Sequence, residues 1–280
     1  MSRLTTLETE LLRIISAYSG KCTYALTDLG SGEKIAHGED EVMPTASLIK
    51  VPVLVALYRS VDEESVSLTD RIRYGDEHRC LGSGVLSRMT PGVEMTVRDA
   101  AVLMIIISDN SATNMVIDLV GLEQVNETMR GFGLEQTTIF QRLGDTKAGL
   151  DARKMSVSTA AEMTRLLELI ARHEAVSPEA SEDMLRVMRR QDYRHELSRL
   201  LPWNEMNMLE NHRENWVAEK GGSFLNGIRT SGAVFHSSRV QFAMSVFCEG
   251  GTGPGTGRES EGNRVNGELG YAAWKALAAG

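Results

Sequence analysis

Hydrophobic residues alternate with polar ones near both ends of the chain and follow a helical period in its middle. Residues 22–38 alternate around a DLGSGE turn, which predicts a hairpin of two antiparallel strands. Short segments rich in β-branched and aromatic residues return near the C-terminus at 216–222, 228–237 and 240–248. The pattern predicts one antiparallel sheet built from both termini.

Helical periodicity dominates the chain from Ser47 to about residue 200. One helix is expected to contain Ser47 and to continue through 51–61, and others are expected at 97–107, 111–120, 122–133, 159–173 and 178–191. Residues 1–20 and 267–277 are also expected to be helical.

These elements predict an α/β fold of the α+β sandwich type, in which helices flank the sheet and an all-helical domain is inserted. The expected α/β domain comprises 1–45 together with 203–280, and the expected helical domain comprises 46–202. A ligand site is expected in the cleft between the two domains.

Composition limits the range of partners. The 280 residues carry a formal charge of −8, which argues against nucleic acid or an anionic membrane as the main partner. The longest apolar run, 100–107, is far too short to span a bilayer. A small molecule or peptide is the expected partner, the chain is expected to be a monomer, and no cofactor is implied.

The N-terminal 20 residues indicate an amphipathic helix with acidic residues instead of a secretory signal. A cytoplasmic location is therefore expected for the chain as given, or a periplasmic or secreted one if it is a mature form. Cys22, Cys80 and Cys248 have no metal-type spacing and are expected to be buried or free thiols. The six histidines are scattered, so no metal site is expected.

Candidate chemistry begins at Ser47 and Lys50, which share one face if they lie a helical turn apart. A serine hydroxyl is a poor nucleophile and needs a nearby base. A lysine can act as that base near neutral pH if burial or a neighbouring positive charge lowers its pKa by about 3 units. Taken alone, this spacing arises easily by chance and equally fits the start of an ordinary helix.

Two further polar stretches change that balance. Ser108, Asp109 and Asn110 interrupt an apolar helix, where Ser108 could relay a proton and Asn110 could donate to a substrate amide. Asp109 or Ser108 is also expected to cap the following helix. Lys220 lies on a predicted strand and is followed by two glycines, which let another backbone approach closely.

Ser47-Leu48-Ile49-Lys50, Ser108-Asp109-Asn110 and Lys220-Gly221-Gly222 together resemble the S-x-x-K, S-D-N and K-T-G motifs of class A β-lactamases and penicillin-binding proteins. The order and separations agree, and the similarity extends over nearly the whole chain. The resemblance implies a β-lactamase/transpeptidase-like fold.

It further implies that Ser47 is acylated, that Lys50 is the base or part of the proton path, and that Ser108 protonates the leaving nitrogen. Backbone N–H groups of Ser47 and Ser223 would form the oxyanion hole. The remaining roles concern the substrate. Lys220 would supply positive charge near it, and Asn110, Gly222 and Arg229 would bind it. Arg229 would receive a carboxylate, with an ordinary exposed arginine as the alternative.

Two positions depart from the family pattern. Gly221 replaces the threonine or serine of K-T-G, which removes a hydroxyl that helps to hold a substrate carboxylate. Arg142-Leu143-Gly144 aligns with the arginine, bulky residue and glutamate of the loop that activates the deacylating water. Asp145 is the nearby replacement for that glutamate and Asp151 a more distant one. Both could instead pair with Arg142 or Arg153 to hold the loop.

Acylation is therefore better supported by the sequence than deacylation. The first hypothesis is a serine hydrolase that is acylated at Ser47 by a β-lactam or related amide or ester and then hydrolyses the acyl-enzyme. A D-alanyl-D-alanine peptidase or acyltransferase relative with a long-lived acyl-enzyme is the second. A non-catalytic binding protein on the same fold is the third, which the intact Ser47, Lys50, Ser108 and Lys220 disfavour.

Overall fold

The computed structural model describes residues 3–144, 151–202, 214–252, 257 and 259–278. A five-stranded antiparallel sheet has the order β2-β1-β10-β9-β8, so the N-terminal hairpin lies beside the three C-terminal strands. The predicted sheet and fold class are thereby confirmed. Its strands are β1 (Lys21–Asp28), β2 (Lys34–His37), β8 (Trp216–Ser223), β9 (Arg229–His236) and β10 (Gln241–Glu249).

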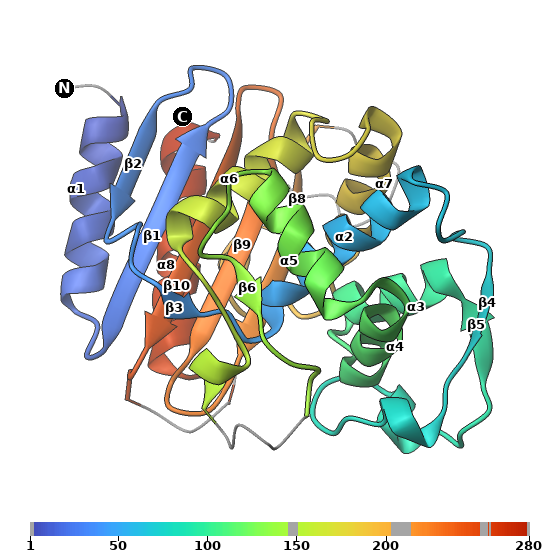
Figure 1. The fold of residues 1–280 in the computed structure, drawn as a ribbon. Coiled ribbons are helices and arrows are strands. Elements are labelled where there is room, and N and C mark those ends of the chain that lie inside the picture. The colour runs from blue at the N-terminus through green and yellow to red at the C-terminus, as the bar shows by residue number, and fades with distance from the viewer. Residues whose placement is uncertain (1–2, 145–150, 203–213, 253–256, 258, 279–280) are drawn as a thin grey trace.

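Helices form most of the remaining described chain (Figure 1). Their bounds are α1 (Arg3–Ser16), α2 (Lys50–Asp62), α3 (Val97–Ile106), α4 (Asn110–Val120), α5 (Leu122–Gly131), α6 (Ala160–Ala171), α7 (Pro178–Arg189) and α8 (Glu261–Leu277). Short strands pair between them: β3 (Met43–Pro44) and β6 (Thr138–Ile139) with β7 (Ser156–Ser158), and β4 (Arg71–Arg73) with β5 (Glu94–Thr96). The hydrophobic pattern does not predict these two- and three-residue strands.

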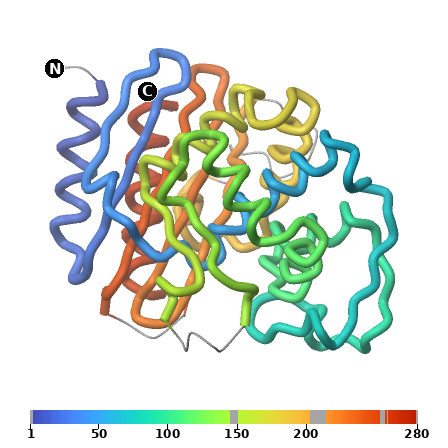
Figure 2. Tube along the Cα trace, viewed as in Figure 1, coloured from blue at the N-terminus to red at the C-terminus, as the bar shows by residue number. Residues whose placement is uncertain are grey.

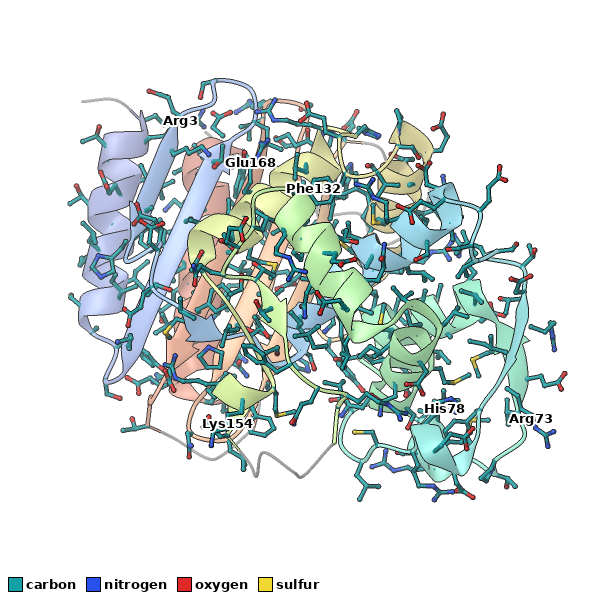
Figure 3. The ribbon with its side chains drawn as sticks, in the orientation of Figure 1. Arg3, Arg73, His78, Phe132, Lys154 and Glu168 are labelled. Carbon is teal, nitrogen blue, oxygen red and sulfur yellow. The ribbon has the colours of Figure 1, made fainter. Side chains whose placement is uncertain are left out.

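Helices cover both faces of the main sheet. Helices α1 and α8 pack together over one face, and Figure 2 shows the two ends of the chain on that side. The guanidinium of Arg3, labelled in Figure 3, donates to the backbone carbonyl of Leu277 at 2.7 Å. Helix α6 packs against β1, β9 and β10 and joins the larger core, which also contains residues of α2 to α5 and α7.

The division into two domains stays a prediction. The position of α6 shows how closely the two predicted domains are joined. The sequence places 160–171 in the helical domain, yet this helix packs directly on the sheet. Its buried Glu168, labelled in Figure 3, accepts from Lys34 of β2 at 3.2 Å. A single apolar core therefore runs from the sheet into the helical part.

Local sequence signals explain several helix starts. Thr96 and Asp99 form a reciprocal capping box before α3, and Ser177 caps α7, which begins with Pro178. One prediction is wrong in detail. Ser47 lies in a 3₁₀ turn (Ala46–Ile49), and the α-helix begins only at Lys50. Lys50 follows directly as the first residue of that α-helix, and the shared face of Ser47 and Lys50 stays a prediction.

Candidate active site

A cavity of about 660 Å³ collects the motif residues. Ser47, Ser108, Asn110, Lys220, Gly221, Gly222 and Ser223 all line it. These residues come from the 3₁₀ turn, the α3–α4 junction and β8, which lie far apart in the sequence. The structure therefore brings together the three motifs that the sequence singled out.

The backbone around Ser47 is unusual. Ala46, immediately before Ser47, has a φ of +45°, and Ser108 has a φ of +53°. Residues other than glycine rarely adopt this left-handed region, and such strain concentrates at functional sites. Ser47 is half-buried, whereas the Leu48 and Ile49 side chains beside it are fully buried in the core. The turn thus anchors its apolar residues and leaves the serine at the cavity.

Lys50 is completely buried at the start of α2. Its Nζ donates to the Ser108 carbonyl at 2.8 Å, to Ser108 Oγ at 2.9 Å and to Asn110 Oδ1 at 2.8 Å. Burial lowers the pKa of Lys50 well below its usual value, and the positive charge of Lys220 lowers it further. Both effects favour loss of a proton from Lys50, and the resulting amine would keep two N–H donors for the three acceptors around it.

Lys220 approaches Ser108 from the opposite side. This lysine is 1% exposed on β8, and its Nζ donates to Ser108 Oγ at 3.1 Å and to the Gly221 carbonyl at 2.5 Å. Ser108 Oγ therefore accepts from the Nζ atoms of two lysines, and its own proton remains available for donation. This arrangement suits a hydroxyl that passes a proton between a lysine and a departing group.

The other two residues of the second motif have separate tasks. Asp109 Oδ1 caps α4 by accepting from Ala112 N at 2.9 Å, and its Oδ2 accepts from Val85 N at 2.6 Å. The prediction that this motif caps the next helix is confirmed for Asp109. Asn110 lines the cavity, and its Nδ2 donates to the Leu81 carbonyl at 2.9 Å.

β8 is an edge strand, and it passes very close to Ser47. A Cβ at Gly222 would lie 2.7 Å from Ser47 N and 2.8 Å from the Thr45 carbonyl, so only glycine fits. Ser223 follows at the end of the strand and also lines the cavity. The oxyanion-hole roles of the Ser47 and Ser223 N–H groups stay predictions, and the close approach of the two segments favours them.

Arg229 differs from both sequence-based alternatives in its surroundings. It is completely buried, so the alternative of an ordinary exposed arginine is wrong. Its Nε donates to Ser260 Oγ at 2.9 Å and its Nη1 to the Phe224 carbonyl at 3.0 Å. The side chain is not among those that line the cavity. A contact between Arg229 and a substrate carboxylate stays a prediction, and these bonds point to a role in holding the strand end.

The wall around Leu143 and Gly144 carries the main departure from the family pattern. Gly144 has a φ of +79°, and a Cβ built on it would lie 2.7 Å from Cys80 Sγ. The thiol thus occupies the space that a side chain at position 144 would need. Asp145, the predicted replacement base, lies outside the described residues. Asp151 caps a 3₁₀ turn by accepting from Arg153 N at 3.0 Å.

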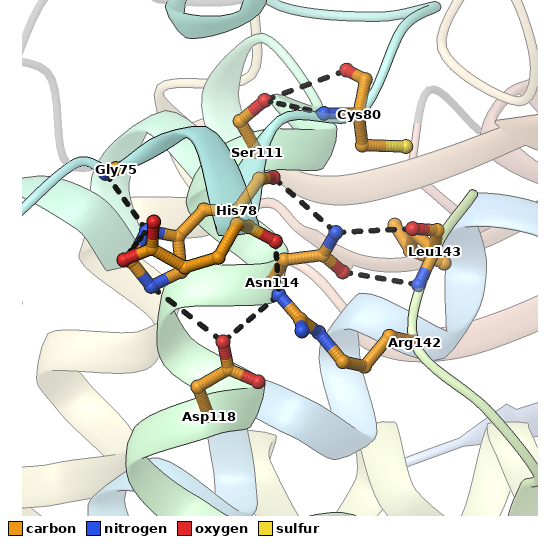
Figure 4. A network of polar contacts seen from close by, with 9 residues as sticks. Gly75, His78, Cys80, Ser111, Asn114, Asp118, Arg142 and Leu143 are labelled. Carbon is orange, nitrogen blue, oxygen red and sulfur yellow. Dashed lines mark hydrogen bonds and ion pairs between the residues drawn. The ribbon is translucent and has the colours of Figure 1, made fainter. Parts of the chain in front are cut away.

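Contacts from α4 hold this wall in place, as Figure 4 shows. Asn114 Nδ2 donates to the Leu143 carbonyl at 3.0 Å, and Leu143 N donates back to Asn114 Oδ1 at 3.0 Å. Arg142 pairs with Asp118 at 2.9 Å. A pairing with Asp145 lies outside the described residues, and Asp151 pairs with Lys154 at 3.9 Å. The sequence contains no signal that Asn114 and Asp118 hold this wall, because their partners Leu143 and Arg142 lie on a distant segment that only the fold brings near.

Sequence reasoning also missed Glu196, which belongs to no motif. It is 4% exposed and lines the cavity beside Lys220 and Gly221. Burial raises the pKa of Glu196, and the negative charge of Glu219 raises it further. No local signal marks Glu196, because it precedes β8 by 20 positions in irregular chain.

Neither a membrane-spanning helix nor a cluster of metal-ligating side chains is found among the described residues. None of the helices there combines the length and apolar character that a bilayer crossing requires. In the same part of the chain, no three His, Cys, Asp or Glu side chains gather as metal ligands would.

Comparisons with known proteins agree with this geometry. The family model described as "Beta-lactamase enzyme family" matches residues 6–277. Beta-lactamase L2 of Stenotrophomonas maltophilia is 30% identical over 116 residues, which cover 41% of this chain and 38% of that protein. The chain thus matches well under two thirds of that relative's length.

Similar solved structures match almost end to end. The beta-lactamase from Sphaerobacter thermophilus has a TM-score of 0.84 and 26% identity, with 96% of this chain and 97% of that chain covered. A variant of PBP-A, solved as an acyl-enzyme complex with penicillin G, has a TM-score of 0.80 and 25% identity, with 97% of each chain covered. Together with the family match over nearly its whole length, these similarities show that the chain belongs to the beta-lactamase enzyme family.

Proposed function

We propose that this protein is a serine hydrolase of the class A β-lactamase type, which is acylated at Ser47 by a β-lactam or a related amide or ester and then releases the acyl group to water. The observation that carries the proposal is the convergence of Lys50 and Lys220 on Ser108 Oγ, at 2.9 and 3.1 Å, in the cavity that Ser47 lines. A protein that only binds a ligand has no need of this proton path.

In the proposed acylation step each of these groups has one role. Ser47 Oγ attacks the substrate carbonyl carbon and gives its proton to the neutral amine of Lys50. The carbonyl oxygen becomes an oxyanion between the N–H groups of Ser47 and Ser223. When the C–N bond breaks, Ser108 gives its proton to the leaving nitrogen and regains one from Lys50. The product is an ester on Ser47, and Lys50 is neutral again.

One observation favours a second candidate, a peptidase or acyltransferase relative with a long-lived acyl-enzyme. The described part of the cavity lining around Gly144 contributes Leu143, Gly144 and the Cys80 thiol, with no carboxylate among them. Deacylation needs a base that activates water. A slow second step is the expected consequence of this wall.

Intact-mass measurement during a time course with a chromogenic cephalosporin tests both candidates. Turnover without a lasting adduct supports complete hydrolysis, and a stable adduct that disappears in Ser47→Ala supports the long-lived acyl-enzyme. Glu268→Gln, at an exposed position on α8, serves as the control and is expected to behave like the wild type. The absence of both turnover and an adduct with β-lactams, esters and peptides would refute the proposal.

A further inference from the structure

Glu196 is the one carboxylic acid among the described residues that line the cavity. The acylation steps above make no use of it. A buried carboxyl group is costly unless it is hydrogen-bonded or paired, so its presence in a ligand cavity calls for a physical reason. Within the described part of the chain, its Oε2 atom is buried and has no hydrogen-bond partner.

The carboxyl group occupies the space of a missing side chain. A Cβ built on Gly221 would lie 2.5 Å from Glu196 Oε2 and 2.9 Å from Oε1. A threonine or serine at position 221 would therefore collide with it. The hydroxyl that the family places next to the lysine of β8 is replaced here by a carboxyl group that comes from another segment. Ser223 Oγ makes a long contact of 3.5 Å with Oε1.

Packing of the next residue holds the backbone at Glu196 in place. The next residue, Leu197, is fully buried in the core between the sheet and α8. A Cβ at Gly270 of α8 would lie only 2.0 Å from the Leu197 carbonyl oxygen, so the segment is pressed against the helix. Glu196 therefore projects from well-packed chain and is a built part of the cavity wall.

The charges beside Glu196 change what this wall can bind. Glu196 and Glu219 both lie near Lys220 and offset its positive charge. Glu219 is itself buried and accepts from Ser231 Oγ at 2.7 Å. Arg229, the other cation expected to attract a carboxylate, donates to Ser260 and the Phe224 carbonyl. The wall thus combines a donor, Lys220, with an acceptor, Glu196, and carries little excess positive charge.

Above the raised pKa of Glu196, about 8, both of its carboxyl oxygens are acceptors, so a substrate carboxylate, which also has only acceptor atoms, would be repelled there. A carboxamide has a carbonyl oxygen that suits the donors of Lys220 or Ser223 and an NH₂ group that suits Glu196. With a carboxylate substrate, the buried Glu196 acceptor would be left without a donor, which costs free energy. With a carboxamide, the NH₂ group would fill that need, so the contact with Glu196 distinguishes the two substrates.

We propose that Glu196 is a specificity-determining residue, which makes the site select substrates with a carboxamide, in place of a carboxylate, at the wall formed by Lys220, Gly221 and Ser223. The inference rests on the proposed function, because its first test measures acylation of Ser47. It concerns the substrate class and assigns Glu196 no part in bond breaking.

The test uses one chromogenic cephalosporin in two forms, with the free ring carboxylate and with the corresponding primary carboxamide. The rate of adduct formation on Ser47 is followed by intact mass for both forms at a pH above the raised pKa of Glu196, which is about 8. The wild type is expected to favour the carboxamide about tenfold or more. Glu196→Gln keeps the shape, removes the charge and adds a donor, so the preference is expected to fall about tenfold. Glu268→Gln is the matched control and is expected to keep the wild-type ratio.

A double variant tests the steric argument separately. Glu196→Ala combined with Gly221→Thr clears the space and returns a hydroxyl to β8, so this variant is expected to favour the carboxylate. Equal rates for both forms in the wild type, or an unchanged ratio in Glu196→Gln, would overturn the inference.

Calorimetric binding of both forms to Ser47→Ala separates this inference from the proposed function. If no adduct forms with either compound but Ser47→Ala binds the carboxamide more tightly, the proposed reaction is refuted and the role of Glu196 is supported. If neither adduct formation nor binding distinguishes the two compounds, the role of Glu196 is refuted.

Discussion

Two walls of the same cavity have very different chemistry. The wall of Ser47, Ser108 and Lys220 contains two fully buried lysines that share one hydroxyl acceptor. The wall of Leu143 and Gly144 presents a glycine with a thiol packed against it. The first wall has the groups needed to form an ester on serine, and the described part of the second has none that would activate water. Retention of the family's motifs therefore does not imply retention of both halves of its reaction.

Among the variants that test the difference between the two walls, substitution of Lys50 is expected to have the largest effect, which is on the rate of Ser47 acylation. Lys50→Met keeps most of the side-chain volume but removes the base and leaves Ser108 Oγ and Asn110 Oδ1 without its donor. We expect acylation of Ser47 to slow by about 10³-fold, because general bases commonly contribute 10² to 10⁴. Stopped-flow measurement with a chromogenic cephalosporin gives the rate.

Lys154→Met changes an exposed lysine and is the matched control. It is expected to acylate at the wild-type rate. A loss of less than tenfold in Lys50→Met would show that Lys50 is not the base of the first wall.

Filling the space at position 144 tests the second wall. Gly144→Ala places an alanine at a φ of +79° with its Cβ 2.7 Å from Cys80 Sγ. We expect the free energy of unfolding to fall by about 2 kcal/mol, of which about 1 reflects the left-handed backbone and the rest the collision. Urea unfolding measures the change.

Gly133→Ala provides the matched control, because Gly133 has a φ of +76° and nothing lies within 4 Å of its Cβ. It should lose only the backbone contribution of about 1 kcal/mol. The excess in Gly144→Ala should shrink when Cys80→Ala is added, which a double-mutant cycle detects. Equal losses at positions 133 and 144 would contradict the packing of Cys80 into this space.

The smallest effect is expected when the support of the second wall is removed. Asn114→Ala removes both hydrogen bonds to the Leu143 backbone and should cost about 1 to 2 kcal/mol in unfolding free energy. Acylation of Ser47 should change by less than about threefold, since none of these bonds reaches the first wall.

Asn126 makes the same paired bonds to the Ile139 backbone, at 3.0 and 2.9 Å, and Asn126→Ala is the control. Both variants should lose similar stability, but only Asn114→Ala should alter the lifetime of the acyl-enzyme. The same lifetime in both variants would mean that the position of Leu143 has no influence on deacylation.

Much of the architecture could be predicted from local sequence. The alternation and turn at 22–38 and the β-branched and aromatic content of the three C-terminal segments predicted the five main strands, of which β1, β9 and β10 are buried on both faces. The three motifs also identified Ser47, Lys50, Ser108 and Lys220 as partners before their distances were known. Spacing and residue type were sufficient there, since each motif constrains a short stretch of backbone.

Other features depended on contacts between distant segments, which no local period records. The burial of Arg229, the thiol of Cys80 in the space beside Gly144 and the carboxyl group of Glu196 beside Gly221 are all of this kind. The sequence by itself determined the main elements of the fold and the three motifs that meet at the cavity. Only the tertiary structure decided what fills the two places where glycine replaces a family side chain, because that depends on which atoms close packing brings there.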